Sequence, residues 1–489
     1  MEKKIISLIL AASFAVYAYS LHNWFCLEDF RHIANAFLIK RNFIYLLRPV
    51  GSDRITIQPF VYFMYYFNYV IFGIKSWGYH LTSILNHLIN ILLLFFLVKK
   101  ITKDKLSAYF ACLLFALSFA FSSAIFHNAQ KDELASISFC LLCLLTFGKW
   151  LRVKIKRYYI YSFIFFIFGL MTHASIILFP VILFLYCFYI EQKKIELRIF
   201  IPFLVTSLGF FLLARYSSPL AASVFSPVEG GSGYSLIGIH PWRNLANYLV
   251  ALYFPNVTQS ISVNLDKLPF SSLLIFTVRL LLVITPCIFI MLFKFGNRIV
   301  RFSIAWIVIM LFMCLLFTSP ISTYYLYFAF PCFALMVGNG LSVLKTKIKR
   351  KFLWKIVMCA FTCYLLVSIF IIQVIEKKYE TKGKKSYNVL QKINQKIPFS
   401  QELKHFYFIN ADDFNVNFLS ENIQLFRQDR IIVHISLFDT NGSINYDLHK
   451  EYRKKDPEFK NVVTNGVAAY HNSYLIRFKG DQILRIRKL

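Results

Sequence analysis

The chain has 489 residues, of which 58% are hydrophobic and 18% aromatic, and its formal net charge is +30. A soluble chain of this length would carry more charged residues and would not repeat apolar runs of about 20 residues, so the composition indicates a polytopic membrane protein. The positive charge alone could suggest nucleic-acid binding. Much of it, however, lies in short clusters between the apolar runs, where it sets membrane topology and needs no polyanionic partner.

Apolar runs recur along the first three quarters of the chain. Because an α-helix rises about 1.5 Å per residue, about 20 apolar residues cross the hydrocarbon core, and the sequence predicts about eleven transmembrane helices. They cover residues 5–21, 79–98, 106–126, 134–150, 158–172, 174–190, 199–215, 271–293, 302–318, 323–344 and 352–374. The first run has the polarity of a signal peptide, but the later spans favour an uncleaved first helix.

Clusters of basic residues fall at every second boundary between these spans, and the positive-inside rule places all of them in the cytoplasm. The N-terminus is then cytoplasmic, the first external loop is long (residues 22–78) and the chain ends outside the membrane. Residues 58–73 are apolar enough to resemble a span, but counting them would reverse every later loop. We therefore interpret them as an interfacial helix on the outer surface, and we expect a multi-pass protein of the cell membrane, the inner membrane of a bacterium.

A polar segment, residues 377–489, follows the transmembrane domain of residues 1–376. Its alternating apolar runs predict strands at residues 405–409, 431–435 and 474–478, with a helix at about 414–426. The predicted fold is therefore an α-helical polytopic membrane protein with a small C-terminal extracytoplasmic α/β domain. Asp412 and Asp413 precede the predicted helix, where they are either an acidic motif or a helix cap.

An acidic pair, Glu28 and Asp29, follows the first span directly. Two adjacent carboxylates at a bilayer exit are costly to desolvate, so they are normally either solvated or functional. Asp29 is the stronger functional candidate, because polar residues elsewhere on the predicted outer face agree with it.

Other polar residues gather at the predicted external ends of the spans. They include Arg31, Arg48, Arg54, His80, His87, His127, Lys131, Asp132, Glu133, His173, Arg243, Tyr324 and Tyr325. Carboxylates, cations and tyrosines at one face suit a lipid phosphate with a polar head group. Cations neutralise phosphate, a carboxylate deprotonates a hydroxyl, and aromatic rings pack on sugars or prenyl chains. Structural roles stay open as well: interhelical hydrogen bonds for the histidines, snorkelling for the arginines, and a solvated turn for residues 131–133.

Short motifs in the first two thirds of the chain resemble those of a known family. They are Leu47-Arg48-Pro49-Val50, Phe72-Gly73-Ile74, Gly78-Tyr79-His80-Leu81-Thr82, Asn86-His87, Phe115-Ala116-Leu117, Lys131-Asp132 with Leu134-Ala135, and Tyr325-Leu326-Tyr327 with Pro331. With an acidic pair in a long first loop and an outward-facing tail, the chain resembles the GT-C glycosyltransferases. The most similar branch is the protein O-mannosyltransferase type, which includes the transmembrane-and-TPR O-mannosyltransferases and their bacterial relatives. The resemblance covers about residues 1–345.

The resemblance implies inverting transfer of a sugar from a polyprenyl-phosphate donor to a hydroxyl acceptor (protein, lipid or glycan) on the extracytoplasmic face, a reaction of the cell envelope. By position, Asp29 would be the general base, and Glu28 would orient it or bind the acceptor. Asp132, with Lys131, would be the acidic site of the second loop. Some relatives bind a divalent metal between these loops and others need none, so a divalent cation held by Asp29 and Asp132 stays open.

The chain also departs from the family. The family's H-P-x-H-x-E motif is replaced by residues 118–123, its S-K-E motif by Thr172-His173-Ala174, and no tetratricopeptide array follows. These departures concern the sugar and the acceptor, whereas the first-loop carboxylates remain.

The expected mechanism is an in-line displacement at the anomeric carbon. Arg48, Lys131 and Arg243 are candidates for neutralising the leaving phosphate, and His80, His173 and Tyr325 are further substrate-binding candidates. A lipid-linked saccharide transporter or flippase is a competing hypothesis, and it would place charged sites near the bilayer midplane. The predicted spans hold few ionisable groups there, Arg279 and Lys355 being exceptions. An O-antigen-ligase-like enzyme and a non-catalytic scaffold also stay open.

Overall fold

The computed structural model describes residues 2–26, 28–47, 58–192, 196–217, 240–254, 271–316 and 322–397, together with four strands between residues 404 and 488. These residues group into two units. The first unit comprises residues 1–21, 44–64 and 78–377, and the second comprises residues 22–43, 65–77 and 378–489.

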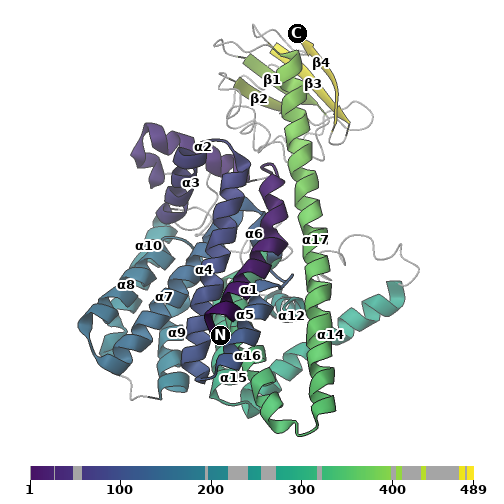
Figure 1. The fold of residues 1–489 in the computed structure, drawn as a ribbon. Helices are drawn as coiled ribbons and strands as arrows, with labels where there is room; N and C mark the ends of the chain where they lie inside the picture. Colours follow the sequence, from purple (N-terminus) through teal and green to yellow (C-terminus); the bar gives the residue numbers. More distant parts are fainter. Residues whose placement is uncertain are drawn as a thin grey trace. The chain divides into compact units, whose positions relative to one another are not determined.

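The first unit is a bundle of helices (Figure 1), which confirms the predicted α-helical membrane fold. Its helices are α1 (Glu2–Tyr17), α4 (Ser76–Thr102), α5 (Lys105–Ala116), α6 (Ser122–Phe126), α7 (Lys131–Val153), α8 (Lys156–Leu170), α9 (Phe179–Leu185), α10 (Ile201–Ser217), α12 (His240–Ala251), α14 (Ser271–Phe295), α15 (Arg298–Leu315), α16 (Leu326–Lys347) and most of α17 (Lys351–Lys396). Within the described residues, seven helical segments are long and apolar enough to cross a membrane. Three shorter apolar helices accompany them. Every predicted span contains a helix.

The basic ends of several helices meet in the first unit. Glu2, at the start of α1, forms ion pairs with Lys99 at the end of α4 (2.5 Å) and with Lys105 at the start of α5 (2.9 Å). Asp104 caps α5 and accepts hydrogen bonds from the Ser107 and Ser342 hydroxyls. Partial burial opposes ionisation of Asp104, but these bonds and two backbone N–H groups prevail and lower its pKa to about 2. The termini that the sequence assigns to one face thus lie together.

The predicted span at residues 106–126 is not one helix. Helix α5 ends at Ala116, and α6 begins only at Ser122. In the irregular segment between them, the Ser368 hydroxyl of α17 donates to the Leu117 carbonyl (2.5 Å) and accepts from the Phe119 N–H (2.8 Å). Irregular backbone is tolerated at membrane depth only where protein groups satisfy it, and Ser368 is fully buried and does so here. A hydropathy pattern does not detect this break, because both halves are apolar.

The second unit contains α2 (Asp29–Arg41), most of α3 (Pro59–Phe72) and the end of α17. The 14 residues of α3 extend only about 21 Å, too short for a bilayer core of about 30 Å. A helix at residues 58–73 was expected from the sequence, and its interfacial location stays a prediction. Helices α2 and α3 contact each other where the His32 and Tyr65 rings stack, 4.5 Å apart.

A four-stranded sheet completes the second unit, and its strand order is β2-β1-β3-β4. The strands are β1 (Lys404–Ile409), β2 (Ile431–Ser436), β3 (Ser473–Lys479) and β4 (Gln482–Lys488). β1 pairs in parallel with β2 and β3, whereas β3 and β4 are antiparallel. The three predicted strands are confirmed and β4 was missed. The helix predicted at residues 414–426, and Asp412 and Asp413, lie outside the described residues.

Ser368→Ala tests the account of the broken helix. The variant leaves the Phe119 N–H and the Leu117 carbonyl buried without the hydroxyl that bridges them, so we expect it to destabilise the protein by about 1–3 kcal/mol. Ser303→Ala in α15 is the matched control. Ser303 is also fully buried, but its Oγ has no hydrogen-bond partner among the described residues, so this change is expected to be neutral or slightly stabilising. Thermal unfolding in detergent measures both, and equal midpoints for the two variants would contradict the account.

Candidate active site

A buried ammonium group organises one end of the helix bundle. Lys131, the first residue of α7, is 1% exposed. Its Nζ donates to the Tyr79 carbonyl (2.5 Å), the Thr82 hydroxyl (3.0 Å), the Ser83 hydroxyl (2.8 Å) and the Asn128 side-chain oxygen (3.3 Å). Three of these oxygens belong to α4. A buried charge is stable only when it is surrounded by such acceptors, so Lys131 fixes the start of α7 against α4.

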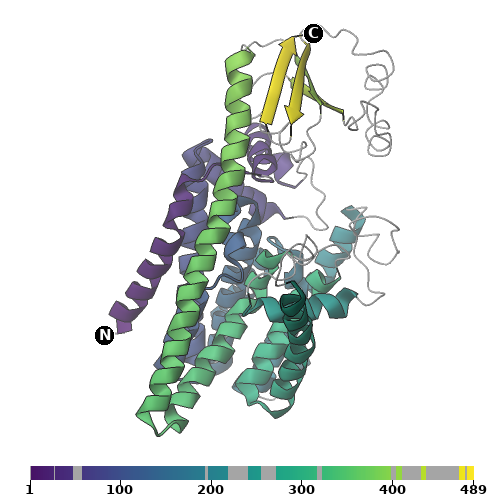
Figure 2. The same ribbon diagram turned by 90° about the vertical axis from the view of Figure 1, so that its right-hand side faces the viewer.

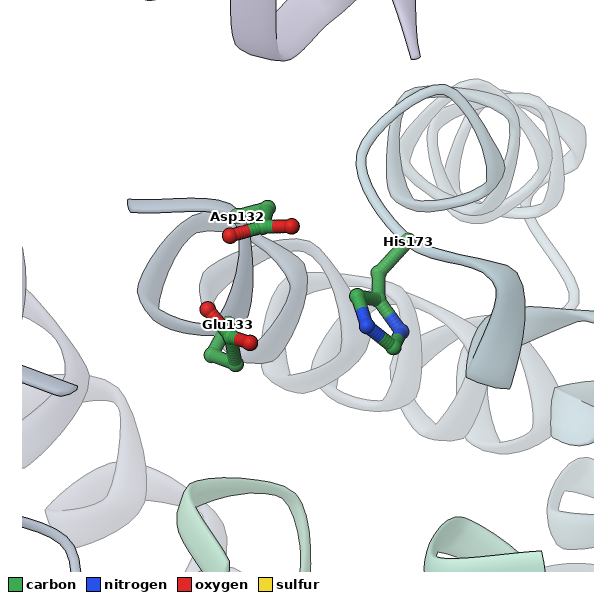
Figure 3. Close-up of side chains that lie close together, drawn as sticks. All are labelled: Asp132, Glu133 and His173. Carbon is green, nitrogen blue, oxygen red and sulfur yellow. The ribbon is translucent and has the colours of Figure 1, made fainter. Parts of the chain in front are cut away.

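Two carboxylates follow Lys131 on the first turn of α7, and a histidine from another segment approaches them. Asp132 is 3% exposed and Glu133 is 1% exposed. Ligand atoms of Asp132, Glu133 and His173 all lie within 4.8 Å of one another. Figure 3 shows one ring nitrogen of His173 on the side of the two carboxylates. A helix N-terminus stabilises negative charge, which helps to explain two acidic residues at this position.

Hydroxyl groups connect the two segments that carry this cluster. The Ser136 hydroxyl, one turn further along α7, donates to the backbone carbonyl of Asp132 and lies 2.8 Å from the Thr172 hydroxyl. Thr172 directly precedes His173, whose ring packs against Phe328 (4.6 Å between centroids) and Tyr325 (6.1 Å). The position of His173 opposite Asp132 is therefore set by polar and aromatic contacts on both sides.

The donor set of the Asp132, Glu133 and His173 cluster suits a divalent cation, but the hydrogen bonding of His173 does not. Two carboxylates and an imidazole are common ligands of zinc and manganese. A metal-bound histidine normally donates a proton from its other nitrogen. Here the Nδ1 atom accepts the Ser175 N–H (3.1 Å), so in the neutral ring the proton is on Nε2. A metal could bind Nε2 only if this proton and the Ser175 hydrogen bond were both lost, so the residues present do not fit a resident metal.

The acidic pair that the sequence predicts to be functional, Glu28 and Asp29, lies in the second unit. Asp29 is the first residue of α2 and is 1% exposed, and its Oδ2 accepts the Cys26 N–H (3.0 Å). Glu28 is the N-cap residue of α2 and its side chain makes no capping hydrogen bond. Burial, and then the charge of Asp29, raises the pKa of the Cys26 thiol well above its usual value, so the thiol stays protonated beside the carboxylate. Asp29 is thus a buried carboxylate at a helix N-terminus.

The remaining candidates from the sequence occupy different environments. His80 is buried and lies 3.0 Å from the Asn128 amide nitrogen through Nε2, close to the ammonium group of Lys131. Tyr325 lies beside His173. Arg243 is exposed near the start of α12. Arg48 lies outside the described residues, as does Arg54.

His87 belongs to the core of the bundle. Its Nδ1 is 2.9 Å from the Tyr327 hydroxyl, and Tyr17 and Phe115 pack against its ring. An interhelical hydrogen bond, one of the roles left open by the sequence, therefore describes this residue. His80, in contrast, belongs to the polar group around Lys131.

The structure adds site residues that the sequence analysis did not propose. Asn128 takes part in the polar group around Lys131, and the hydroxyls of Ser136 and Thr172 connect the segments that carry the His173 cluster. Glu133, which the sequence placed only among the polar residues of the outer face, belongs to that cluster. Two sequence features could have indicated a site here: the adjacent carboxylates Asp132 and Glu133, and the i, i+3 spacing of Asn128 and Lys131. Both features are also typical of a solvated turn.

Comparisons with known proteins agree with this fold. Residues 57–217 match the family described as dolichyl-phosphate-mannose-protein mannosyltransferase. The crystal structure of ArnT from Cupriavidus metallidurans in the apo state is similar, with a TM-score of 0.54, 11% identity and coverage of 96% of this chain and 92% of that one. ArnT bound to undecaprenyl phosphate gives a TM-score of 0.52, 12% identity and the same coverage.

The archaeal oligosaccharyltransferase AglB from Archaeoglobus fulgidus, in complex with an inhibitory peptide and a dolichol-phosphate, is also similar. Its TM-score is 0.53 at 12% identity, and the match covers 97% of this chain and 69% of that one. No curated protein matches the sequence. At these identities the structural matches concern the fold, and the family match concerns a third of the chain.

The fold of the chain is similar to that of ArnT and AglB, and residues 57–217 match a mannosyltransferase family. These findings agree with the GT-C resemblance stated from the sequence, and the multi-pass membrane location is confirmed.

Metal titration tests the interpretation of the His173 cluster. A resident metal at 100 times its dissociation constant would stabilise the fold by about 2.7 kcal/mol, which corresponds to several degrees in the unfolding midpoint. Because binding must displace the Nε2 proton and the Ser175 hydrogen bond, we expect zinc or manganese to leave the midpoint of the chelator-treated protein nearly unchanged. A rise of several degrees that His173→Gln abolishes, and that His240→Gln on α12 retains, would establish a metal site instead.

Proposed function

We propose that the protein transfers a sugar from a polyprenyl-phosphate donor to a hydroxyl of an acceptor, by inverting displacement on the extracytoplasmic face. The observation that carries the proposal is the buried carboxylate of Asp29 at the start of α2 in a chain of GT-C fold. The solved structures of similar fold bind undecaprenyl phosphate and dolichol-phosphate, which supports a donor of this class.

Asp29 acts as the general base in this proposal. The acceptor oxygen attacks the anomeric carbon, the hydroxyl proton passes to the Asp29 carboxylate, and the bond from the anomeric carbon to the phosphate oxygen breaks. The lipid leaves as polyprenyl phosphate and the anomeric configuration inverts. The Cys26 N–H, which donates to Oδ2, and the N-terminus of α2 stabilise the carboxylate form. Glu28 orients the acceptor.

Positive groups assist departure of the phosphate. Arg243 is exposed and can approach the phosphate directly, and Arg48 has the same role by its motif. Lys131 acts differently, because four oxygens surround its ammonium group. We assign it a favourable electrostatic effect and the positioning of Asp132. His80, His173 and Tyr325 stay candidates for binding the substrate, as the sequence predicts.

The proposed orientation places the basic helix ends around Glu2 in the cytoplasm and the Lys131 end of the bundle outside, in the inner membrane of a bacterium. Membrane lipids surround the bundle and no nucleic acid takes part. A transporter is disfavoured, since the charged residues of α7 lie in its first turn and near its C-terminal end and not in its middle.

Asp29→Asn tests the base. The amide oxygen of Asn can still accept the Cys26 N–H, so the fold should persist while proton removal fails. Since general base catalysis contributes about 10²–10⁴-fold, we expect at least a 100-fold loss of transfer in proteoliposomes supplied with a radiolabelled polyprenyl-phosphate sugar.

Glu28→Gln is the companion variant, and less than tenfold loss is expected because this residue only orients the acceptor. Unfolding midpoints of both variants check that they fold. Near-normal transfer by a well-folded Asp29→Asn variant would show that another group is the base.

A further inference from the structure

The last turns of α17 carry a cationic surface that the transfer reaction does not use. Residues 376–397 contain seven lysines and two glutamates. Both glutamates, Glu376 and Glu380, are buried, and Glu380 pairs with Lys384. Six of the seven lysines are exposed, all except Lys382. The surface of this segment is therefore positively charged, because its carboxylates are buried and most of its ammonium groups are exposed.

A cleft lies between this part of α17 and the sheet of the second unit. Figure 2 shows the strands beside the last turns of α17. The cleft has a volume of about 380 Å³, and Val389 of α17 and Ile483 of β4 contribute its apolar lining. Its polar lining comes from Lys385, Asn388, Gln391, Lys392 and Gln395. Among the described residues, the lining contains two ammonium groups, three amides and no carboxylate.

The spacing of the polar residues places them on one face of the helix. Lys385, Lys392 and Gln395 are separated by seven and three residues, so they lie along one stripe, and Asn388 lies between the lysines. The positions of the two lysines are about two helical turns apart, or roughly 10 Å along the helix axis, and Asn388 and Gln391 lie between them. Each amide offers both donors and an acceptor, which suits the vicinal hydroxyls of a sugar, whereas ammonium groups suit carboxylate or phosphate.

The opposite face of the helix is anchored, so the orientation of the cleft is fixed. A Cβ on Gly383 would lie only 2.6 Å from the Trp24 carbonyl oxygen, which shows how closely the helix approaches this segment. The Trp24 and Tyr387 rings meet edge to face at 5.0 Å. Leu390 and Ile393 are buried. The polar face is thus preorganised, which lowers the entropic cost of binding a ligand.

We propose that this cleft is a binding subsite for an anionic saccharide, namely the part of the acceptor that carries acidic or phosphorylated sugars. This rests on the proposed function for its role in transfer, but the binding itself does not need the reaction. The amides distinguish a saccharide from a bare anion, because a phosphate group alone would use the lysines and leave the amides without a role.

Binding of defined oligosaccharides to the full chain in zwitterionic nanodiscs tests the subsite. We expect tetragalacturonate to bind by calorimetry at least tenfold more tightly than the neutral maltotetraose, and inorganic phosphate to compete only weakly. Lys385→Gln with Lys392→Gln should weaken tetragalacturonate binding about tenfold, which is about 1.4 kcal/mol. Asn388→Ala with Gln395→Ala should weaken saccharide binding and leave phosphate binding unchanged.

The matched control is Lys377→Gln with Lys378→Gln, which removes the same charge from exposed positions of α17 outside the cleft. Equal weakening by both lysine pairs, or equal binding of phosphate and tetragalacturonate, would overturn the proposal in favour of diffuse charge attraction. Asp29→Asn should bind the oligosaccharide as the wild type does. Binding without any transfer by the wild type would reject the proposed function alone, and transfer without binding would reject the subsite alone.

Discussion

The burial of the Lys131 ammonium group is the constraint on which one end of the bundle depends. A cation that is 1% exposed requires acceptors, and it obtains them from the Tyr79 carbonyl, two hydroxyls of α4 and Asn128. Removing it would leave these oxygens unsatisfied and would release the start of α7 from α4. Because Asp132 and Glu133 follow it in the first turn, the same contact sets where the two carboxylates can lie and which histidine they meet.

Two helix N-termini position the acidic residues of the candidate site. Asp132 and Glu133 begin α7 in the first unit, and Asp29 begins α2 in the second. A helix N-terminus favours a carboxylate, so each acidic group is stabilised by the helix that it begins. The helices of the bundle hold their polar residues in fixed positions. The proposed reaction needs one carboxylate to accept a proton and cations to stabilise the leaving phosphate.

The sequence predicted the parts of the fold that depend on hydropathy and charge. Basic clusters at alternate helix ends predicted that the N-terminus and the loop at residues 99–105 share one face, and in the structure Glu2 pairs with Lys99 and Lys105. Of the polar residues predicted on the opposite face, the structure brings Asp132 close to His173, and His173 close to Tyr325. It did not predict the break after Ala116, because that break depends on hydrogen bonds from Ser368, some 250 residues away. It also ended the last span at residue 374, since polarity marks the end of a membrane span but not the end of a helix that continues to Lys396.

The central claim is that the Asp29 carboxylate takes the acceptor proton during sugar transfer. The most direct test is a cryo-electron microscopy structure of the protein in nanodiscs with a non-transferable polyprenyl-phosphate sugar. The account predicts an anomeric carbon facing the Asp29 carboxylate, with space for one acceptor hydroxyl between them. A donor bound in a cavity that Asp29 does not reach would contradict the account.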